Sequence, residues 1–320
     1  MTEAFQSKPD QQVSVANTFG IESTLQVDAF SERNDYVPDI DPAYVFDREV
    51  TLAVLSGFTH NRRVLVAGLH GTGKSSHIEQ IAARLNWACL RVNLDGHISR
   101  FDLVGKDTIT LKDGQQITKF QEGIVPWSLQ RPVALVFDEL DAARPEVMFV
   151  IQRVLEREGK FTLLDQNKVI TPHPFFRLLA TSNTVGLGNL NGLYHGSQLG
   201  NQAQIDRWNV VALLDYLEPG IESEIVCSRV PEMGSVQGRE TVSAMVAFAG
   251  LTRNGFEAGD LSTLMSPRTV IAWAENLAVF ERVDSALRYS YLNKCDPSEL
   301  ALLGELYQRC FDQELSDGSS

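Results

Sequence analysis

A glycine-rich segment, Gly68-Leu-His-Gly-Thr-Gly-Lys-Ser75, has the residue types that bind a chain of phosphates. It matches G-x-x-x-x-G-K-S in full and stands between an apolar strand-like run and a helical pattern. Glycines let the backbone turn its N–H groups toward a phosphate, and a helix beginning near Gly73 adds the positive end of its dipole. Lys74 would reach the β- and γ-phosphates, and the Ser75 hydroxyl would bind Mg²⁺. The residues expected to hold ATP with Mg²⁺ are Gly68, His70, Gly71, Thr72, Gly73, Lys74, Ser75 and Ser76.

Two acids, Asp138 and Glu139, follow directly after the apolar run PVALVF. Parallel strands present ligand sites at their carboxyl ends, so we expect both acids beside the phosphate loop. Asp138 is then a cofactor-binding partner of Mg²⁺. Glu139 is the base that polarises the attacking water, a role worth about 10²- to 10⁴-fold in rate. The alternative is that the acids only cap the next helix.

Three more residues are catalytic candidates. Asn183 ends the next apolar run, FFRLLATSN, where an amide can hold the lytic water and sense the γ-phosphate; a turn asparagine is the alternative. Arg207 precedes another strand-like run and could enter a neighbouring subunit's site as an arginine finger, unless it only pairs with Asp206 at the surface. Arg268 stands in the first turn of a helix, where a bound phosphate would offset its repulsion by the dipole; a solvated arginine is the alternative.

Other patterns point away from competing chemistry. Asn293-Lys-Cys-Asp296 matches the N-K-x-D string of GTPases, but it follows a helical run far outside the strand–helix alternation, so we expect adenine rather than guanine. The histidines show no H-E-x-x-H spacing and the four cysteines form no C-x-x-C pair. We therefore expect no transition-metal site and reduced thiols.

The net charge of −13 argues against an extended nucleic-acid-binding face. No window approaches the roughly 18 apolar residues that span a bilayer, and the sequence MTEAFQSKPDQQ lacks the apolar core of a signal peptide. We expect a cytosolic protein with neither nucleic acid nor membrane as partner.

The elements that position these residues alternate along the chain. Apolar runs at 62–68, 89–93, 132–139, 175–183 and 208–216 are separated by helical patterns. Such alternation predicts an α/β fold with a parallel sheet and helices on both faces. The helix after the first strand carries an apolar stripe at Ile78, Ile81, Ala82 and Leu85.

Two β-hairpins are expected as insertions, one around Asp113-Gly114 and one within FTLLDQNKVI. After about Glu218 the strand-like runs stop, and one helix opens at Ser266-Pro267. The expected organisation is an arm or loosely packed extension at 1–43, a nucleotide-binding domain at 44–217 and a smaller all-α lid at 218–320.

Together these motifs resemble a P-loop NTPase of the AAA+ class, in its MoxR branch. Longer segments are similar to the AAA+ subunits of aerobic cobaltochelatase, over nearly the whole chain from about Phe19. The segments are GLHGTGKSSHIEQIAARLNW, RVNLDGHISRFDLVGKD, FQEGIVPWSLQRPVALVFDELDAARPEVMFVIQRVLE, LLDQNK and NTVGLGNLNGLYHG.

The resemblance implies a homo-hexameric ring with ATP at subunit interfaces. It gives Arg207 the finger role in trans and makes Arg268 the lid arginine, in cis or on a neighbour's nucleotide. It gives cis roles to Lys74, Ser75, Asp138, Glu139 and Asn183. It also implies two partners, a subunit with an adhesion-type (von Willebrand A-like) domain and a large corrin-binding subunit. The implied reaction is ATP-dependent insertion of cobalt(II) into hydrogenobyrinic acid a,c-diamide.

Three rival functions stay open. Another MoxR-type remodelling ATPase, which activates a different metalloenzyme or complex, would share the branch motifs. A nucleic-acid motor is disfavoured by the negative charge. A regulatory ring that binds but does not cleave nucleotide is disfavoured by the intact Glu139.

Overall fold

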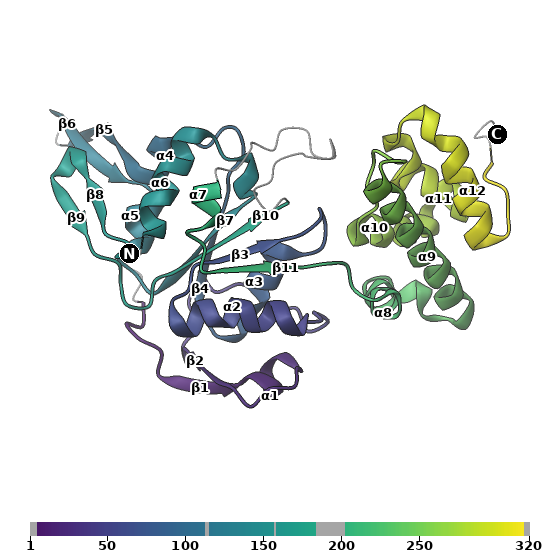
Figure 1. Cartoon of the computed structure of the whole chain (residues 1–320), viewed down its shortest axis with the longest axis horizontal. Coiled ribbons are helices and arrows are strands. Elements are labelled where there is room, and N and C mark those ends of the chain that lie inside the picture. The colour runs from purple at the N-terminus through teal and green to yellow at the C-terminus, as the bar shows by residue number, and fades with distance from the viewer. Residues whose placement is uncertain (1–4, 113–114, 157, 184–201, 317–320) are drawn as a thin grey trace. The chain divides into compact units, whose positions relative to one another are not determined.

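The computed structural model of the chain describes residues 5–112, 115–156, 158–183 and 202–316. The chain forms two compact units, and Figure 1 labels their helices and strands. The first is built from described residues up to Leu214, and the second from Asp215 onward together with Leu69–Thr72.

Five parallel strands form the central sheet of the first unit, in the order β11-β3-β10-β7-β4 (Figure 1). Every residue of β3, β7 and β10 is buried, as expected for strands covered on both faces. The parallel sheet predicted from the alternating apolar runs is therefore confirmed. The strands are β3 Val64–Ala67, β4 Ala88–Asn93, β7 Val133–Asp138, β10 Arg177–Ser182 and β11 Val210–Leu213.

Helices cover both faces of this sheet, because successive side chains of a strand point to opposite sides. One hydrophobic core joins Val66 and Leu179 to residues of α2 and α3, including the predicted stripe around Ile78. A second core joins Leu65 and Leu178 to residues of α4, α5 and α6. The helices are α2 Arg48–His60, α3 Lys74–Arg84, α4 Arg100–Val104, α5 Ile124–Leu129, α6 Pro145–Leu155 and α7 Gln202–Ile205.

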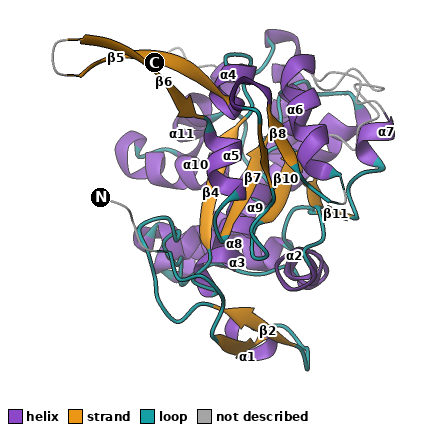
Figure 2. Cartoon of the chain, turned by 90° about the vertical axis from the view of Figure 1, so that its left-hand side faces the viewer, coloured by secondary structure: helices purple, strands orange, loops and turns teal. Residues whose placement is uncertain are grey.

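Both predicted hairpins are present. β5 (Gly105–Lys112) pairs antiparallel with β6 (Gln115–Glu122), and β8 (Phe161–Leu163) pairs antiparallel with β9 (Lys168–Ile170). The β5–β6 ribbon projects beyond the central strands in Figure 2. Its turn at 113–114 lies outside the described residues.

The N-terminal segment differs from the loosely packed extension expected for 1–43. Its described part contains β1 (Gln11–Ser14), α1 (Val15–Phe19) and the antiparallel partner strand β2 (Gln26–Ala29). Val15, Phe19 and Phe30 are buried in the same core as α2 and α3. Elements of four or five residues are too short to show a period, which is why the sequence pattern did not reveal them.

The second unit is helical, as predicted. Its aromatic core contains Phe248, Trp273, Tyr291 and Tyr307, each at most 1% exposed. Over the described residues, no helix combines the length and apolar content needed to cross a membrane. Its elements are α8 Pro219–Arg229, η3 Pro231–Gly234, α9 Val236–Ala258, α10 Pro267–Phe280, α11 Val283–Ser290, η4 Leu292–Lys294, η5 Pro297–Glu299 and α12 Leu300–Phe311.

The N-K-x-D string lies in this helical unit. Asn293 belongs to the 3₁₀ turn η4, and Asp296 caps η5 by accepting a hydrogen bond from the Ser298 amide at 2.9 Å. Asp296 thus has a capping role, and the string lies outside the parallel sheet, as its place in the sequence indicated.

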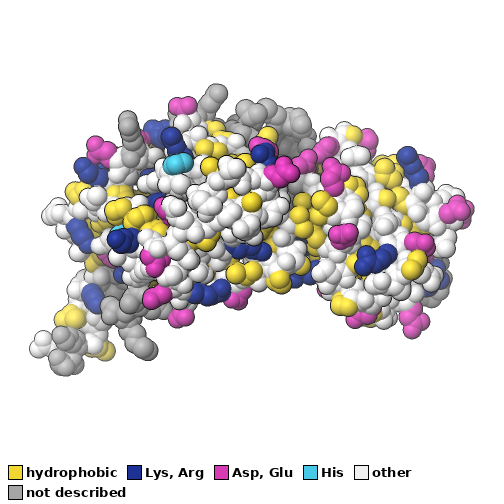
Figure 3. Space-filling model, turned by 90° about the horizontal axis from the view of Figure 1, so that it is seen from below, with side chains coloured by type: hydrophobic (Ala, Val, Ile, Leu, Met, Phe, Trp, Pro, Cys, Tyr) yellow, Lys and Arg dark blue, Asp and Glu magenta, His cyan; other side chains and the backbone are white. Residues whose placement is uncertain are grey.

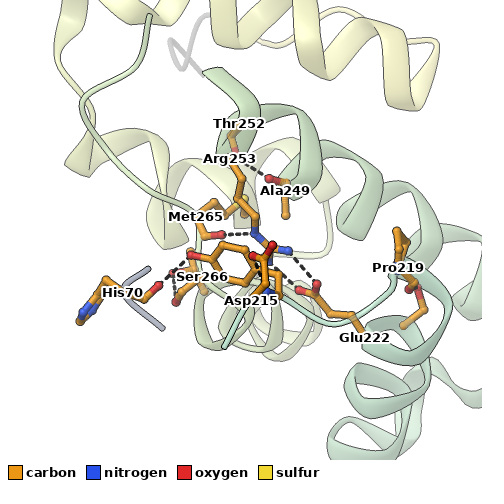
Figure 4. A network of polar contacts seen from close by, with 12 residues as sticks. His70, Asp215, Pro219, Glu222, Ala249, Thr252, Arg253, Met265 and Ser266 are labelled. Carbon is orange, nitrogen blue, oxygen red and sulfur yellow. Dashed lines mark hydrogen bonds and ion pairs between the residues drawn. The ribbon is translucent and has the colours of Figure 1, made fainter. Parts of the chain in front are cut away.

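A buried ion pair ties the helical unit together (Figure 4). Arg253 on α9 donates to both carboxylate oxygens of Glu222 on α8, at 2.7 Å each, and their side chains are 8% and 2% exposed. Arg253 Nε donates to the Met265 carbonyl just before α10, and the guanidinium lies 4.0 Å from the ring centre of Tyr216. One arginine therefore connects three parts of the unit.

Removing one partner would leave an unpaired buried charge. We expect Glu222→Ala to lower the free energy of unfolding by about 3–5 kcal/mol, measured by urea denaturation with circular dichroism. Glu224→Gln, on the exposed side of the same helix, is the control and should change stability by less than about 0.5 kcal/mol. Equal effects of the two substitutions would contradict a structural role for the pair.

Candidate nucleotide site

The phosphate loop joins β3 to α3. Gly71 (φ 81°) and Gly73 (φ 90°) adopt left-handed backbone conformations that favour glycine, and Gly73 is the N-cap of α3. The helix starts at Lys74, so its first amides and its dipole end at the loop. Ser75 and Ser76 stand in its first turn. The strand–loop–helix context that the motif requires is therefore present.

The tip of the loop is held through its backbone. The Tyr216 hydroxyl donates to the His70 carbonyl at 2.7 Å (Figure 4), and the Thr72 hydroxyl donates to the Leu69 carbonyl at 3.0 Å. These contacts hold the loop by its carbonyl groups.

Lys74 and Asn183 meet across neighbouring elements. Lys74 Nζ donates to the Gly68 carbonyl and to Asn183 Oδ1, at 2.9 Å each. The lysine is 8% exposed. Asn183 directly follows β10, which pairs with β3, and its backbone N–H donates to the Asp141 carboxylate at 3.2 Å. The strand pairing thus brings together two residues that are 109 positions apart.

Asp138 is the most heavily bonded group of the site. Its Oδ1 accepts hydrogen bonds from the Ser75 hydroxyl at 2.5 Å and from the Thr181 hydroxyl. Its Oδ2 accepts from Arg91 Nε at 2.7 Å and lies 2.5 Å from Arg91 Nη2. Burial alone would raise the pKa of Asp138, but the hydrogen bonds from Ser75 and Thr181 and the charge of Arg91 outweigh it and hold the pKa below its usual value. The carboxylate is therefore ionised and fixed in orientation.

Glu139 follows Asp138 in a left-handed conformation (φ 57°, ψ 50°). Such a conformation costs a residue with a side chain roughly 1–3 kcal/mol and is concentrated at functional sites. The Glu139 amide donates to the Thr181 hydroxyl at 3.1 Å. Thr181 therefore links Asp138 and Glu139, at the end of β7, to the end of β10.

Neither Arg207 nor Arg268 belongs to the elements that carry Lys74, Asp138 and Asn183. Arg207 stands between α7 and β11, and its Nε donates to Glu156 at 3.0 Å rather than to the neighbouring Asp206 that the sequence suggested. Arg268 is the second residue of α10 in the helical unit and is exposed. Their catalytic roles stay predictions.

Several contacts of the site were not predicted from the sequence. One is the contact of Arg91 with Asp138. A charged residue inside the strand run CLRVN was the sequence feature that could have indicated it. His77 is another: its Nδ1 lies 3.1 Å from the Tyr44 hydroxyl and its Nε2 lies 3.0 Å from the Thr51 hydroxyl. His77 is 1% exposed, and burial lowers its pKa to about 4, so the ring is neutral at pH 7.

This histidine makes the first unit sensitive to acid. Between pH 6.5 and about 4 the unfolded chain binds a proton that folded His77 does not, so its stabilising contribution is present above pH 6.5 and is lost as the pH falls. We expect a drop from pH 7 to pH 5 to lower the free energy of unfolding by about 2 kcal/mol more in the wild type than in His77→Gln. Urea denaturation in EDTA without nucleotide measures the difference. Equal losses in the two proteins would exclude His77 as the titrating group.

Two family models match the chain. The cobaltochelatase CobS subunit N-terminal model matches residues 4–37, and the AAA domain model of the dynein-related subfamily matches residues 63–195. The first covers the segment of β1, α1 and β2, and the second covers the P-loop and the acids Asp138 and Glu139.

Among curated proteins, the aerobic cobaltochelatase subunit CobS of Sinorhizobium sp. is 61% identical over 309 residues, which cover 97% of this chain and 93% of that protein. Midasin of Dictyostelium discoideum is 28% identical over 217 residues, 65% of this chain and 3% of midasin. Among solved structures, the branch migration motor RuvB of Thermotoga maritima has a TM-score of 0.47 at 15% identity, over 81% of this chain and 67% of that chain. On the identity and coverage shared with the first of these relatives, the chain belongs to the family of the aerobic cobaltochelatase subunit CobS, with an AAA-type ATPase domain.

Proposed function

We propose that this chain couples Mg-ATP hydrolysis, in a homo-hexameric ring, to the insertion of cobalt(II) into hydrogenobyrinic acid a,c-diamide. The observation that carries the nucleotide part is the convergence of Lys74, Ser75, Asp138 and Asn183 at one end of the sheet, through contacts of 2.5–2.9 Å. The support for the cobalt part is the 61% identity to a cobaltochelatase subunit. Cobalt and the corrin are substrates of the assembly in this proposal.

The loop amides and Lys74 bind the phosphates. Lys74 Nζ is held by Gly68 and Asn183, so the fold itself fixes the ammonium group beside the loop. When ATP binds, the ammonium exchanges these neutral oxygens for charged phosphate oxygens, which form stronger hydrogen bonds. The left-handed glycines keep the loop in the shape that directs N–H groups inward.

The residues present fit Mg²⁺. This cation prefers oxygen ligands, and the Ser75 hydroxyl lies 2.5 Å from an ionised carboxylate oxygen of Asp138. Ser75 would bind the ion directly, and Asp138 would hold it through a water molecule. When bound, Mg²⁺ neutralises charge on the β- and γ-phosphate oxygens.

Glu139 and Asn183 act on the water. Glu139 accepts a proton from the attacking water as general base, while the Asn183 amide orients the water and the γ-phosphate. The left-handed backbone at Glu139, with its amide bonded to Thr181, supports a carboxylate held in a set position beside Asp138.

Two arginines complete the proposed ring site. Arg207 stabilises transition-state charge on the nucleotide of a neighbouring subunit, an effect worth about 10³- to 10⁵-fold. Its pairing with Glu156 at the surface supports a side chain that is accessible before assembly. Arg268 contacts the nucleotide from the lid, in cis or in trans. We propose that the lid domain begins at residue 218.

The partners in this proposal are a subunit with an adhesion-type (von Willebrand A-like) domain and a large corrin-binding subunit. Nucleic acid is not among them. On the face seen in Figure 3, Lys and Arg side chains are interspersed with Asp and Glu rather than gathered in a stripe, and the net charge is −13. All four cysteines are free thiols, which suits the reducing cytosol in which we place the protein.

A second candidate function is that of another MoxR-type remodelling ATPase. The AAA model matching residues 63–195 supports it, because that part of the chain contains the general ATPase motifs and none of the N-terminal segment. Reconstitution distinguishes the two functions: cobalt insertion with both partner subunits, corrin and ATP supports the chelatase. ATPase activity without any cobalt insertion in that mixture would favour the remodelling enzyme.

We expect Glu139→Gln to lower kcat for ATP hydrolysis by about 10²- to 10⁴-fold while ATP stays bound, because the amide keeps the shape but cannot accept the proton. Lys74→Ala should abolish nucleotide binding. Phosphate release and binding of a fluorescent ATP analogue measure the two effects, and cobalt insertion in the reconstituted mixture should fall with kcat. Glu146→Gln, an exposed change on α6, is the control. Wild-type hydrolysis by Glu139→Gln would show that another group is the base.

The trans role of Arg207 has its own test. Arg207→Ala and Glu139→Gln subunits should each be inactive alone, yet a mixture should recover part of the ATPase activity, because some interfaces then combine an intact arginine with an intact base. ATPase activity of the mixture against the ratio of the two variants measures this. Absence of recovery at every ratio would restrict Arg207 to its surface pair.

A further inference from the structure

Arg91 is a charged residue in the middle of a strand that lies against β7. The register pairs Arg91 with Val136 and Asn93 with Asp138, so Arg91 reaches the Asp138 carboxylate diagonally, two residues along the neighbouring strand. Two of its nitrogens approach the same oxygen, Oδ2, at 2.7 Å from Nε and 2.5 Å from Nη2. The aspartate that receives them is 3% exposed.

The two oxygens of Asp138 are divided between two kinds of donor. The Arg91 guanidinium donates to Oδ2, whereas the hydroxyls of Ser75 and Thr181 donate to Oδ1. Rotation of the carboxylate about its Cβ–Cγ bond would break the contacts at both oxygens, so the paired N–H groups of Arg91 resist that rotation. The oxygen left for the P-loop side is the one that already contacts Ser75.

A cation beside a magnesium partner could also repel the metal. Here the positive charge is shared, because Arg91 Nη1 lies 3.7 Å from Glu79 on α3 as well. The group of Asp138, Arg91 and Glu79 has a net charge of −1 when all three are ionised. The arginine side chain is 40% exposed, and solvent screens its charge further. Orientation of the carboxylate is therefore the larger effect.

We propose that Arg91 is a positioning residue for metal-dependent ATP hydrolysis, which fixes the plane of the Asp138 carboxylate so that one of its oxygens faces Ser75. This inference rests on the proposed Mg-ATP function and adds a residue to it. Arg91 acts through Asp138, which it contacts directly. Loss of a group that orients a metal partner in this way typically lowers metal affinity by about 10- to 100-fold.

The test compares Arg91→Met, Arg91→Gln and Glu79→Gln in the full chain. Arg91→Met removes every donor, Arg91→Gln keeps a donor without the charge, and Glu79→Gln removes the second carboxylate near Arg91 while leaving Asp138 untouched. We expect Arg91→Met to raise the Mg²⁺ concentration for half-maximal ATPase activity by about 10-fold. We expect Arg91→Gln to recover part of this loss and Glu79→Gln to remain close to the wild type.

Three measurements do not depend on turnover. Mn²⁺ binding in the presence of a non-hydrolysable ATP analogue, followed by electron paramagnetic resonance, should weaken in Arg91→Met by a similar factor. Binding of a fluorescent ATP analogue in EDTA and the thermal unfolding midpoint should stay close to the wild type.

Three results would overturn the inference. An unchanged metal requirement in Arg91→Met would show that the arginine does not position Asp138. A lower requirement would show that Arg91 acts as a charge that repels the metal. Equal losses of Mn²⁺ binding and of nucleotide binding in EDTA would show a purely structural role. Failure of the proposed function would appear in the wild type itself, as absent or metal-independent hydrolysis, and would overturn both statements.

Discussion

The site depends on one buried carboxylate. Asp138 is 3% exposed at the end of β7 and remains ionised because donors from three other elements, Ser75 on α3, Thr181 on β10 and Arg91 on β4, bind it. A buried charge without such donors would cost several kcal/mol, by order of magnitude. The parallel order β3-β10-β7-β4, with α3 following β3, is what brings these donors to the same place, so fold and site are specified together.

Much of the fold could be predicted because its signals are local. Fully apolar runs mark β3, β7 and β10, and glycines mark the loop that needs left-handed backbone at Gly71 and Gly73. The motif also predicted that Lys74 and Ser75 would stand at the start of a helix. In each case the residues that determine the structure lie within about ten positions of one another, so the sequence shows them as a pattern.

The remaining features depend on contacts between distant residues. Arg91 meets Asp138 over 47 positions, and Arg207 meets Glu156 over 51, so no spacing rule could choose Glu156 over the adjacent Asp206. The N-terminal segment was expected to pack loosely, since β1, α1 and β2 are too short for a period; its burial depends on a core that α2 and α3 complete. Catalytic roles are harder still to predict from a sequence pattern, because they depend on contacts with a bound nucleotide and with a neighbouring subunit.

The most direct measurement is a structure of the assembled protein with Mg²⁺ and a non-hydrolysable ATP analogue. The account predicts that the Lys74 ammonium leaves Asn183 for the β- and γ-phosphates, that the Ser75 hydroxyl leaves Asp138 for the metal, and that Asp138 keeps its contact with Arg91. A nucleotide bound elsewhere, with Lys74 still on Asn183 and Ser75 still on Asp138, would contradict it.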